Sequence, residues 1–420
     1  MDDCLTRDLL PTYDEIIDYV YDQFKLSYCA PALSPKDLKE LCSVRPDGVA
    51  LLSKASLWVP NSILLYKLYQ VPVFFTEGPV DSLINEDTVQ FDVYLNAFLF
   101  LSGLQERACL TKDKFGRFPY QESLQCKYGF VDTPVVNVYF ELLAEAIKAK
   151  GHDCIKVEFE QKIIFTHDID QIRSGWLTDV RYYVSNFNFK NCLGIFKSIG
   201  IKVFRFPDPY YKGLLKMLEL DEQNEVKGVS FLMANKKHQD ADYQLESLVG
   251  RELFQNQTIG LHPGLDTYDN PKEFDNQLKK IKKLFPKMKP VVRQHFLKYD
   301  INVTPAIQES LGIEKDYSLG FVEQKGFRNG IANPFYLYCF EKRRAYKVLQ
   351  IPLYFMDGTL TNHQHDFSFR AKKNVIQDVE KLVRTFNCSF SVLFHNSVFT
   401  ETTYRGFEEM YLKLIAISKS

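Results

Sequence analysis

The sequence predicts an α/β protein in which a distorted (β/α)7 barrel follows a smaller mixed α/β domain. At 420 residues, the chain is longer than one compact core normally accommodates. From about residue 155, short β-rich runs alternate with amphipathic stretches, as in repeated βα units. We count seven such runs. Seven parallel strands with interleaved helices favour a barrel, although an open sheet would show the same periodicity.

Residues 1–152 are expected to form the N-terminal accessory domain. The segment Thr12-Tyr13-Asp14-Glu15 has the form of a helix capping box, and apolar residues follow it at helical spacing. The apolar run Val71–Phe75 predicts a strand. The segments Phe91–Leu104 and Val136–Ala149 predict buried or half-buried helices. We find no catalytic constellation in this first third of the chain.

Residues 153–420 are expected to form the barrel domain. The predicted strands are Ile163–Phe165, Val229–Met233, Thr258–Leu261, Val291–Val292, Tyr317–Leu319, Tyr346–Phe355 and Phe390–Phe394. The predicted helices are 242–254, 271–284, 304–311, 372–386 and 405–417. The stretch 171–228 is too long for one βα connection, so we expect one or two inserted helices there, broken at Pro207-Asp208-Pro209.

Composition narrows the class of protein. The net charge is −1, from 52 basic and 53 acidic residues, so the overall charge gives no reason to expect nucleic acid or an anionic membrane as a partner. Nine scattered cysteines without a close pair favour reduced thiols, and the N-terminus lacks the features of a signal peptide, so we expect a cytoplasmic protein. No apolar run approaches the ~20 residues of a membrane span.

The residues that follow the predicted strands are the candidates for function, because active sites of βα barrels lie at the carboxyl ends of the strands. Four of the eight histidines fall there. A lone histidine at a strand end is more often structural, but four at one barrel mouth are harder to explain in that way. The strand-end candidates are His167, His262, His295, His395, Asp168, Asp170, Arg293 and Asp357.

The order of these residues resembles that of the polysaccharide deacetylase family (carbohydrate esterase family 4, the NodB homology domain). Asp168-Ile169-Asp170 resembles the motif in which the first aspartate is the general base and the second is a metal ligand. Ile259–Asp266 resembles the motif that supplies histidine ligands, so His262 is expected to bind the metal. Asp266 stands where the family usually has a second histidine, and His295 is the other candidate for the third ligand.

Two further motifs complete the resemblance. Arg293-Gln294-His295-Phe296 resembles the motif in which an arginine orients the catalytic carboxylate and the backbone N–H of an aromatic residue helps to bind the oxyanion, although His295 replaces the usual proline. Leu393-Phe394-His395-Asn396 resembles the motif whose histidine protonates the leaving group. Asp357 is expected to orient one of the charged catalytic groups or to contact substrate, or else to be a turn residue before Gly358.

Segments outside these motifs add to the resemblance. Residues 91–137 resemble the uncharacterised domain that precedes the deacetylase domain in some bacterial proteins from surface-polysaccharide loci. The loop Gly326–Gly330 also resembles that subgroup, so Arg328 is expected to help shape the sugar pocket, unless the loop is simply a glycine-rich turn. The histidines within Asn362–Asp366 have no strand context and are expected in an exposed loop.

The resemblance implies a hydrolase that uses a divalent metal ion, with Zn²⁺ as the expected ion, to deacetylate a sugar or polysaccharide precursor. Two alternatives remain open at this point. The chain could be a degenerate deacetylase fold that binds a glycan or a partner without hydrolysis, because its ligand motif departs at Asp266. It could also keep the metal and hydrolyse a non-sugar amide, since a fold and a metal do not determine the substrate.

Overall fold

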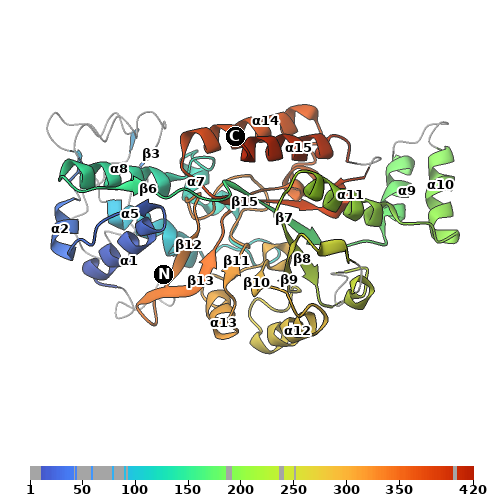
Figure 1. Cartoon of the computed structure of the whole chain (residues 1–420), viewed down its shortest axis with the longest axis horizontal. Helices are drawn as coiled ribbons and strands as arrows, with labels where there is room; N and C mark the ends of the chain where they lie inside the picture. The colour runs from blue at the N-terminus through green and yellow to red at the C-terminus, as the bar shows by residue number, and fades with distance from the viewer. Residues whose placement is uncertain are drawn as a thin grey trace.

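The computed structural model describes residues 11–41, 43–44, 58–59, 78–79, 89–90, 93–185, 192–235, 241–249, 252–400 and 404–420. The described residues form a mixed α/β structure whose centre is a nine-stranded sheet (Figure 1). Among these residues, no helix combines the length and the apolar character that crossing a bilayer requires. The predicted strand Val71–Phe75 lies outside the described residues.

The central sheet contains eight parallel strands and one antiparallel strand at its edge. Its order is β12-β13-β11-β10-β9-β8-β7-β15-β14, and only the β12–β13 pair is antiparallel. The strands are β7 (Ile163–Ile169), β8 (Val229–Met233), β9 (Thr258–His262), β10 (Val291–Val292), β11 (Lys315–Asp316), β12 (Phe335–Cys339), β13 (Arg344–Gln350), β14 (Leu353–Met356) and β15 (Phe390–His395).

The sheet curls because β13 and β14, which are consecutive in sequence, lie on opposite sides of it. Only Ile351 and Pro352 separate β13 from β14, yet β13 pairs with β11 while β14 pairs with β15. The same segment bonds to both sides, since the N–H of Ile351 donates to the carbonyl of Asp316 and the carbonyl of Pro352 accepts from Ser391. One extended segment therefore connects the two sides of the curled sheet. The sheet is a half-barrel of nine strands, which is consistent with the expected barrel but not with the seven strands that we counted in the sequence.

Helices cover the outside of the curled sheet (Figure 1). The helices α14 (Phe369–Thr385) and α15 (Phe407–Ser418) lie together on one side, and α12 (Pro271–Leu284) and α13 (Thr304–Ser310) lie on the other. Local sequence explains where these helices begin. Asn270 caps α12, whose first residue is a proline, and the Ser368 side chain caps α14. The buried face of each helix packs into the same hydrophobic core as the strands.

The N-terminal residues pack against the far end of this sheet. The helices are α1 (Tyr13–Lys25), α2 (Pro35–Glu40), α5 (Val93–Leu101), α6 (Leu104–Arg107), α7 (Leu124–Lys127) and α8 (Val135–Ala149). The capping box that we predicted at Thr12 and Glu15 is present at the start of α1, and every residue of α5 is buried. Residues of β12 complete this helical core, so the N-terminal helices and the edge of the large sheet share one set of apolar contacts.

Short strands account for the remaining β structure in this part of the chain. They form three two-stranded antiparallel pairs, namely β1 (Tyr28–Cys29) with β6 (Ile155–Lys156), β2 (Ser43–Val44) with β5 (Val89–Gln90), and β3 (Trp58–Val59) with β4 (Gly78–Pro79). The β1–β6 pair joins the start of the chain to the segment that leads into β7.

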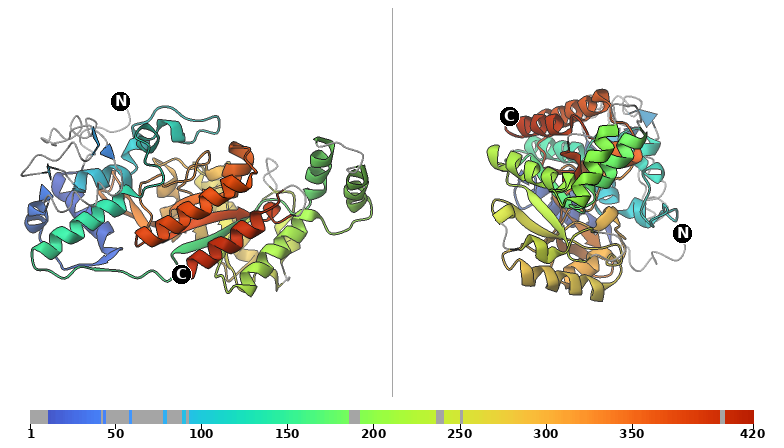
Figure 2. Two further views of the ribbon diagram at one scale, coloured as in Figure 1. Left: turned by 90° about the horizontal axis from the view of Figure 1, so that it is seen from above. Right: turned by 90° about the vertical axis from the view of Figure 1, so that its right-hand side faces the viewer.

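The described residues between β7 and β8 contain three helices rather than the expected one or two, namely α9 (Gly175–Ser185), α10 (Cys192–Val203) and α11 (Pro209–Gln223). The predicted break is present, because Asp208 caps α11 and Pro209 is its first residue. While α11 lies along the sheet, α9 and α10 stand away from the rest of the molecule, at the end opposite the N-terminal helices (Figure 2).

Several predicted elements need correction. The run Tyr346–Phe355 spans two strands, because Pro352 cannot donate a hydrogen bond to the strand ladder. The helix predicted at 242–254 is wrong, since the described residues of this segment form two short 3₁₀ turns, Leu245–Leu248 and Glu252–Phe254. Tertiary hydrogen bonds explain why this segment does not form a helix. The Asp242 carboxylate accepts the backbone N–H groups of Ile172 and Arg173, in the loop that follows β7. The antiparallel strand β12 was not predicted.

Candidate metal centre

The predicted site residues lie at the carboxyl ends of neighbouring parallel strands. Asp168 lies near the end of β7 and Asp170 directly follows that strand. His262 is the last residue of β9, and His395 is the last residue of β15. His295 follows the short strand β10. Because these strands run in the same direction, their ends bring residues that are far apart in sequence to one edge of the sheet.

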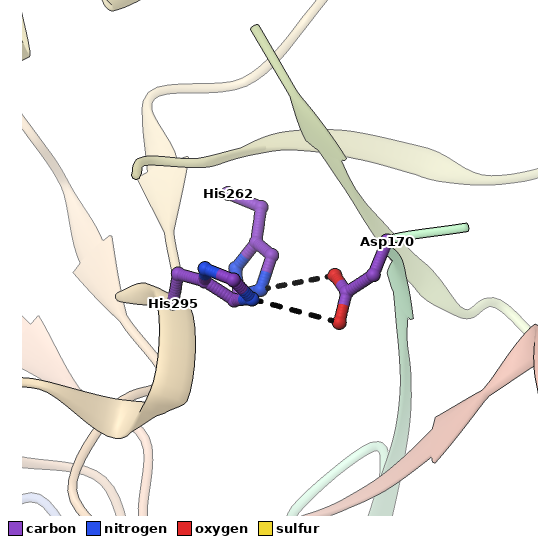
Figure 3. A group of neighbouring side chains, drawn as sticks. All are labelled: Asp170, His262 and His295. Atoms are coloured by element: carbon purple, nitrogen blue, oxygen red, sulfur yellow. Dashed lines mark ion pairs between the residues drawn. The ribbon is translucent and has the colours of Figure 1, made fainter. Parts of the chain in front are cut away.

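Asp170, His262 and His295 form a cluster that can hold a metal ion (Figure 3). One ligand atom from each residue lies within 4.8 Å of the others. The Asp170 carboxylate faces both rings from one side, with Oδ1 3.4 Å from Nε2 of His262 and Oδ2 3.7 Å from Nε2 of His295. Oδ1 of Asp170 is buried and has no hydrogen-bond partner among the described residues. Two imidazoles and a carboxylate suit Zn²⁺ and related divalent transition metals.

Both the tautomer and the charge of His262 fit a metal ligand. Its Nδ1 lies 2.5 Å from the carbonyl oxygen of Arg293, and a carbonyl can only accept, so Nδ1 carries the proton. This leaves the lone pair on Nε2, which faces the cluster. Burial lowers the pKa of His262 against the opposing effect of Asp168 and Asp170, and therefore favours the neutral ring that a metal requires.

The electrostatic balance at Asp170 favours a carboxylate. Burial opposes ionisation of this side chain, but a hydrogen bond from His295 and the imidazoles of His262 and His395 hold its pKa below the ordinary value. Asp170 is therefore ionised at neutral pH and contributes a negative charge to the cluster.

Asp168 is paired with a buried arginine next to the cluster. Nη1 of Arg293 lies 3.2 Å from Oδ1 of Asp168, and the other carboxylate oxygen lies 3.6 Å from Nε2 of His262. The guanidinium is fully buried, where Nε donates to the carbonyl of Tyr317 and the group lies over the ring of Phe231. These contacts orient the arginine, which in turn fixes the position of the Asp168 carboxylate.

His395 is paired with a buried aspartate. Its Nδ1 lies 2.6 Å from Oδ1 of Asp357, and its Nε2 lies 3.6 Å from Oδ2 of Asp170. Burial lowers the pKa of His395, but the charge and hydrogen bond of Asp357, together with the nearby aspartates, outweigh that effect and raise the pKa to about 10. The ring is therefore a proton donor at neutral pH.

Phe296 has a backbone conformation that non-glycine residues rarely adopt. Its φ is 57°, in the left-handed region, and its ring is 44% exposed. Its carbonyl accepts a hydrogen bond of 2.7 Å from Nη1 of Arg117. A backbone N–H next to the metal cluster can bind a developing negative charge.

One cavity of about 980 Å³ contains the metal cluster, Asp168, His395 and Phe296. Part of its wall comes from the N-terminal residues, where we expected no functional group. Lys114 and Arg117 line this cavity, and the ring of Phe115 stacks at 5.4 Å against Phe296. The predicted exposed loop also contributes Asn362 and His363. Sequence periodicity carries no signal for a loop that becomes functional only when one part of the chain packs against another.

Three residues lie outside this arrangement. Asp266 is half-buried and does not belong to the cluster, in which His295 is the third residue. Arg328 lies in a buried ion pair with Glu106 rather than in the wall of the cavity. His167 points away from the cluster and bonds to Asp221, which also accepts from the hydroxyl of Tyr411.

Comparisons with known proteins give a family match for the N-terminal part of the chain. Residues 10–152 match the sequence model of a family of unknown function, DUF7033. No curated protein matches the sequence. Among solved structures, a protein from Mycobacterium smegmatis described as a candidate polysaccharide deacetylase is 11% identical, with a TM-score of 0.38. The match covers 62% of this chain and 87% of that protein.

Proposed function

We propose that this protein is a metal-dependent hydrolase that removes N- or O-acetyl groups from a sugar or polysaccharide precursor. The observation that carries the proposal is a pair of buried ion pairs beside one metal cluster. The guanidinium of Arg293 pairs with Asp168 and holds its carboxylate next to the cluster. The carboxylate of Asp357 favours the charged, acidic form of His395. An oriented carboxylate that can accept a proton and a protonated histidine that can donate one are what amide or ester hydrolysis requires.

The metal ligands are Asp170, His262 and His295 in this proposal. A divalent cation held by these residues would supply Lewis acidity, both to polarise the acetyl carbonyl and to lower the pKa of water. The protein prepares this site in two ways. It keeps His262 neutral by burial, and it fixes the ring with the carbonyl of Arg293.

Asp168 is the proposed general base. Its carboxylate lies between the Arg293 guanidinium and the ring of His262, so it is oriented toward the metal cluster. Arg293 stabilises the position of the carboxylate in the cavity. The carboxylate takes the proton from the attacking water.

Phe296 and His395 act on the other atoms of the scissile group. The backbone N–H of Phe296 donates to the carbonyl oxygen as that oxygen becomes negative. Nε2 of His395 gives its proton to the leaving nitrogen or oxygen, while Asp357 stabilises the imidazolium on the opposite edge of the ring. The products are acetate and the deacetylated sugar.

The size and walls of the cavity support a sugar substrate. A volume of about 980 Å³ lies at the upper end of what small-ligand pockets offer, so several sugar units can enter. The rings of Phe115 and Phe296 contact each other at its wall, tilted by 30°, and offer an apolar surface. Asn362, His363 and Lys114 add polar groups that can bond to hydroxyls.

The test is acetate release by the purified full-length chain. The metal-loaded protein is assayed on chitin-type oligomers, acetylated nucleotide sugars and small acetylated amides, which also separates a sugar deacetylase from a non-sugar amidase. We expect Asp168→Asn and His395→Ala to lose at least about a hundredfold in kcat. Asp153→Asn and His152→Ala are the matched controls, because both residues are exposed and lie outside the cavity. Full activity in the first two variants would sink the proposed roles.

The alternative is a glycan- or partner-binding module without hydrolytic activity, which the departures from the family motifs at Asp266 and His295 favour. Metal analysis separates the two proposals. A chain that takes up one divalent ion per molecule and releases acetate fits the hydrolase. A chain that binds acetylated oligomers but takes up no metal on titration fits the binding module.

A further inference from the structure

The inserted helices α9 and α10 take no part in the proposed chemistry. They stand away from the body of the molecule at the end opposite the N-terminal helices (Figure 2). The two helices contact each other closely where Gly194 faces Tyr183, since a Cβ at position 194 would lie 2.6 Å from the tyrosine ring. The pair is therefore a defined hairpin with a long exposed surface.

Large apolar side chains are exposed along this hairpin. On α10, Leu193, Phe196, Ile199 and Val203 recur every three or four residues, so they share one side of the helix. Phe196 is 73% exposed and Val203 is 65% exposed. Phe204 and Phe206 extend the exposed apolar surface beyond the end of the helix. A cluster of exposed aromatic and aliphatic residues of this kind marks a binding surface.

The charged residues of this hairpin are basic, apart from Asp179 of α9, which is buried. Residues 180–207 contain no aspartate or glutamate, although acidic residues make up 53 of the 420 residues of the chain. The charged residues in this range are Arg181, Lys190, Lys197, Lys202 and Arg205. The overall net charge of −1 hides this local segregation. The partner of this surface therefore combines apolar groups with negative charge.

A second cavity, of about 480 Å³, lies at the base of the hairpin. Three basic side chains line it, those of Arg173, Lys202 and Arg205, together with the rings of Trp176, Phe206 and Tyr211. Its one acidic residue, Asp208, is already engaged, since its carboxylate accepts the backbone N–H groups of Gly175, Trp176 and Tyr210. The positive charge of the cavity wall is therefore available to an anionic group such as a phosphate.

This cavity lies next to the metal cavity. Gln171 and Tyr210 line the metal cavity, while their sequence neighbours Ile172 and Tyr211 line the second cavity. A surface to which the hairpin binds would consequently lie close to the proposed catalytic site.

We propose that the α9–α10 hairpin docks on an anionic membrane surface. The exposed side chains of Phe196, Val203 and Phe204 insert among the acyl chains at the interface. Arg173, Lys202 and Arg205 face the lipid phosphates. Apolar residues together with exposed basic charges are the features that bind interfacial helices to anionic bilayers. A second copy of this chain fits less well, because a symmetric contact through this surface would bring like charges together.

The inference does not depend on deacetylase activity, and co-sedimentation of the full chain with vesicles tests it directly. One set of vesicles contains phosphatidylcholine alone, and the other contains about one third phosphatidylglycerol. We expect binding to the anionic vesicles at least about tenfold tighter, weakening as salt rises. Phe196→Ser/Phe204→Ser and Lys202→Gln/Arg205→Gln should each reduce that binding at least about tenfold. Two independent pairs protect the test against misfolding of one variant.

Matched controls are available elsewhere on the surface. Leu110→Ser removes an apolar residue that is 78% exposed, and Lys282→Gln/Lys283→Gln removes two exposed charges from α12, so both variants should bind as the wild type does. Equal binding by the hairpin variants and the controls would overturn the proposal. It would also be overturned if the wild type formed a dimer without vesicles and Phe196→Ser/Phe204→Ser abolished the dimer, because that result assigns the surface to a second copy.

Discussion

The Asp357 carboxylate holds His395 at two points. Oδ2 accepts the backbone N–H of His395 at 2.7 Å, while Oδ1 lies 2.6 Å from the ring Nδ1. Asp357 is itself 1% exposed, so little water screens this interaction. The two contacts set both the position and the charge of the ring, and they direct Nε2 toward the metal cluster.

Asp357→Asn should therefore impair the proposed acid. The aspartate is the main reason that the pKa of His395 is about 10 in spite of burial, so its removal lowers that pKa. We expect kcat to fall about a hundredfold, and the basic limb of its pH profile to move to lower pH because the ring loses its proton earlier. The profile is measured on metal-loaded enzyme, with Asp153→Asn as control. A variant with an unchanged basic limb would remove His395 from the role of acid.

The two candidates for the third metal ligand can be separated by substitution. His295 belongs to the cluster with Asp170 and His262, whereas Asp266 does not. We expect His295→Ala to weaken metal affinity about a hundredfold or more, and Asp266→Asn to change it less than threefold. Affinity is measured by competition with a coloured chelator. The opposite ranking would show that Asp266 supplies the ligand.

The sequence predicted the candidate metal cluster because its members follow strands in a regular order. Asp168, Asp170 and His262 each stand where an apolar run ends, and parallel strands bring such positions together. His295 was one of two alternatives for the third ligand, because a motif that lacks its usual histidine does not show which neighbour replaces it. Only the geometry of the folded chain distinguishes His295 from Asp266.

The contribution of the N-terminal residues was not predictable from local patterns. Phe115 and Arg117 lie about 180 residues from Phe296 in sequence, and contacts between distant loops leave no periodicity. The same limit explains why Arg328 was wrongly expected in the sugar pocket. A glycine-rich loop with an arginine indicates an exposed binding loop. The buried Glu106 that pairs with this arginine lies on α6, more than 200 residues earlier in the sequence.

Arg117 is predicted to position the backbone of Phe296. Its guanidinium donates to the Phe296 carbonyl and is held by the carboxylate of Asp113, so it stabilises a left-handed conformation that costs about 1 kcal/mol or more. We expect Arg117→Met to lower kcat at least about tenfold with a smaller change in KM, and Arg117→Lys to recover part of it. Lys112→Met, at an exposed position outside the cavity, is the control. A change in KM alone would indicate a role in substrate binding instead.

Arg328 is predicted to stabilise the fold. Its guanidinium bonds to Glu106 at 2.6 and 3.1 Å, and both side chains are almost completely buried. Arg328→Met leaves a buried carboxylate unpaired, so we expect a loss of about 3–5 kcal/mol in the free energy of unfolding. Glu106→Leu/Arg328→Met removes both charges and should recover most of that loss. Urea denaturation measures both variants, and an increase in KM without a loss of stability would restore Arg328 to the substrate pocket.

The buried carboxylate of Asp316 predicts how the stability of the fold depends on pH. Asp316 is fully buried on β11, and burial raises its pKa to about 6, against the opposing effect of hydrogen bonds from Ser318 and Gln308 and of the charge of Arg293. The folded state therefore binds a proton more tightly than the unfolded state, in which the pKa of Asp316 is near the ordinary value of 3.8. The stabilisation from this group is complete below about pH 4 and is lost as the pH rises through about 6.

Asp316→Asn should flatten that part of the stability profile. Because the amide does not titrate, we expect the stability of the variant relative to the wild type to increase between about pH 4 and pH 7, by at most about 3 kcal/mol. The free energy of unfolding in urea is measured at several pH values across this range. Asp153→Asn, at an exposed position, should keep the wild-type slope. If the slope of Asp316→Asn also matched the wild type, Asp316 would be ionised in the folded state throughout this range, and its hydrogen bonds and Arg293 would outweigh the effect of burial.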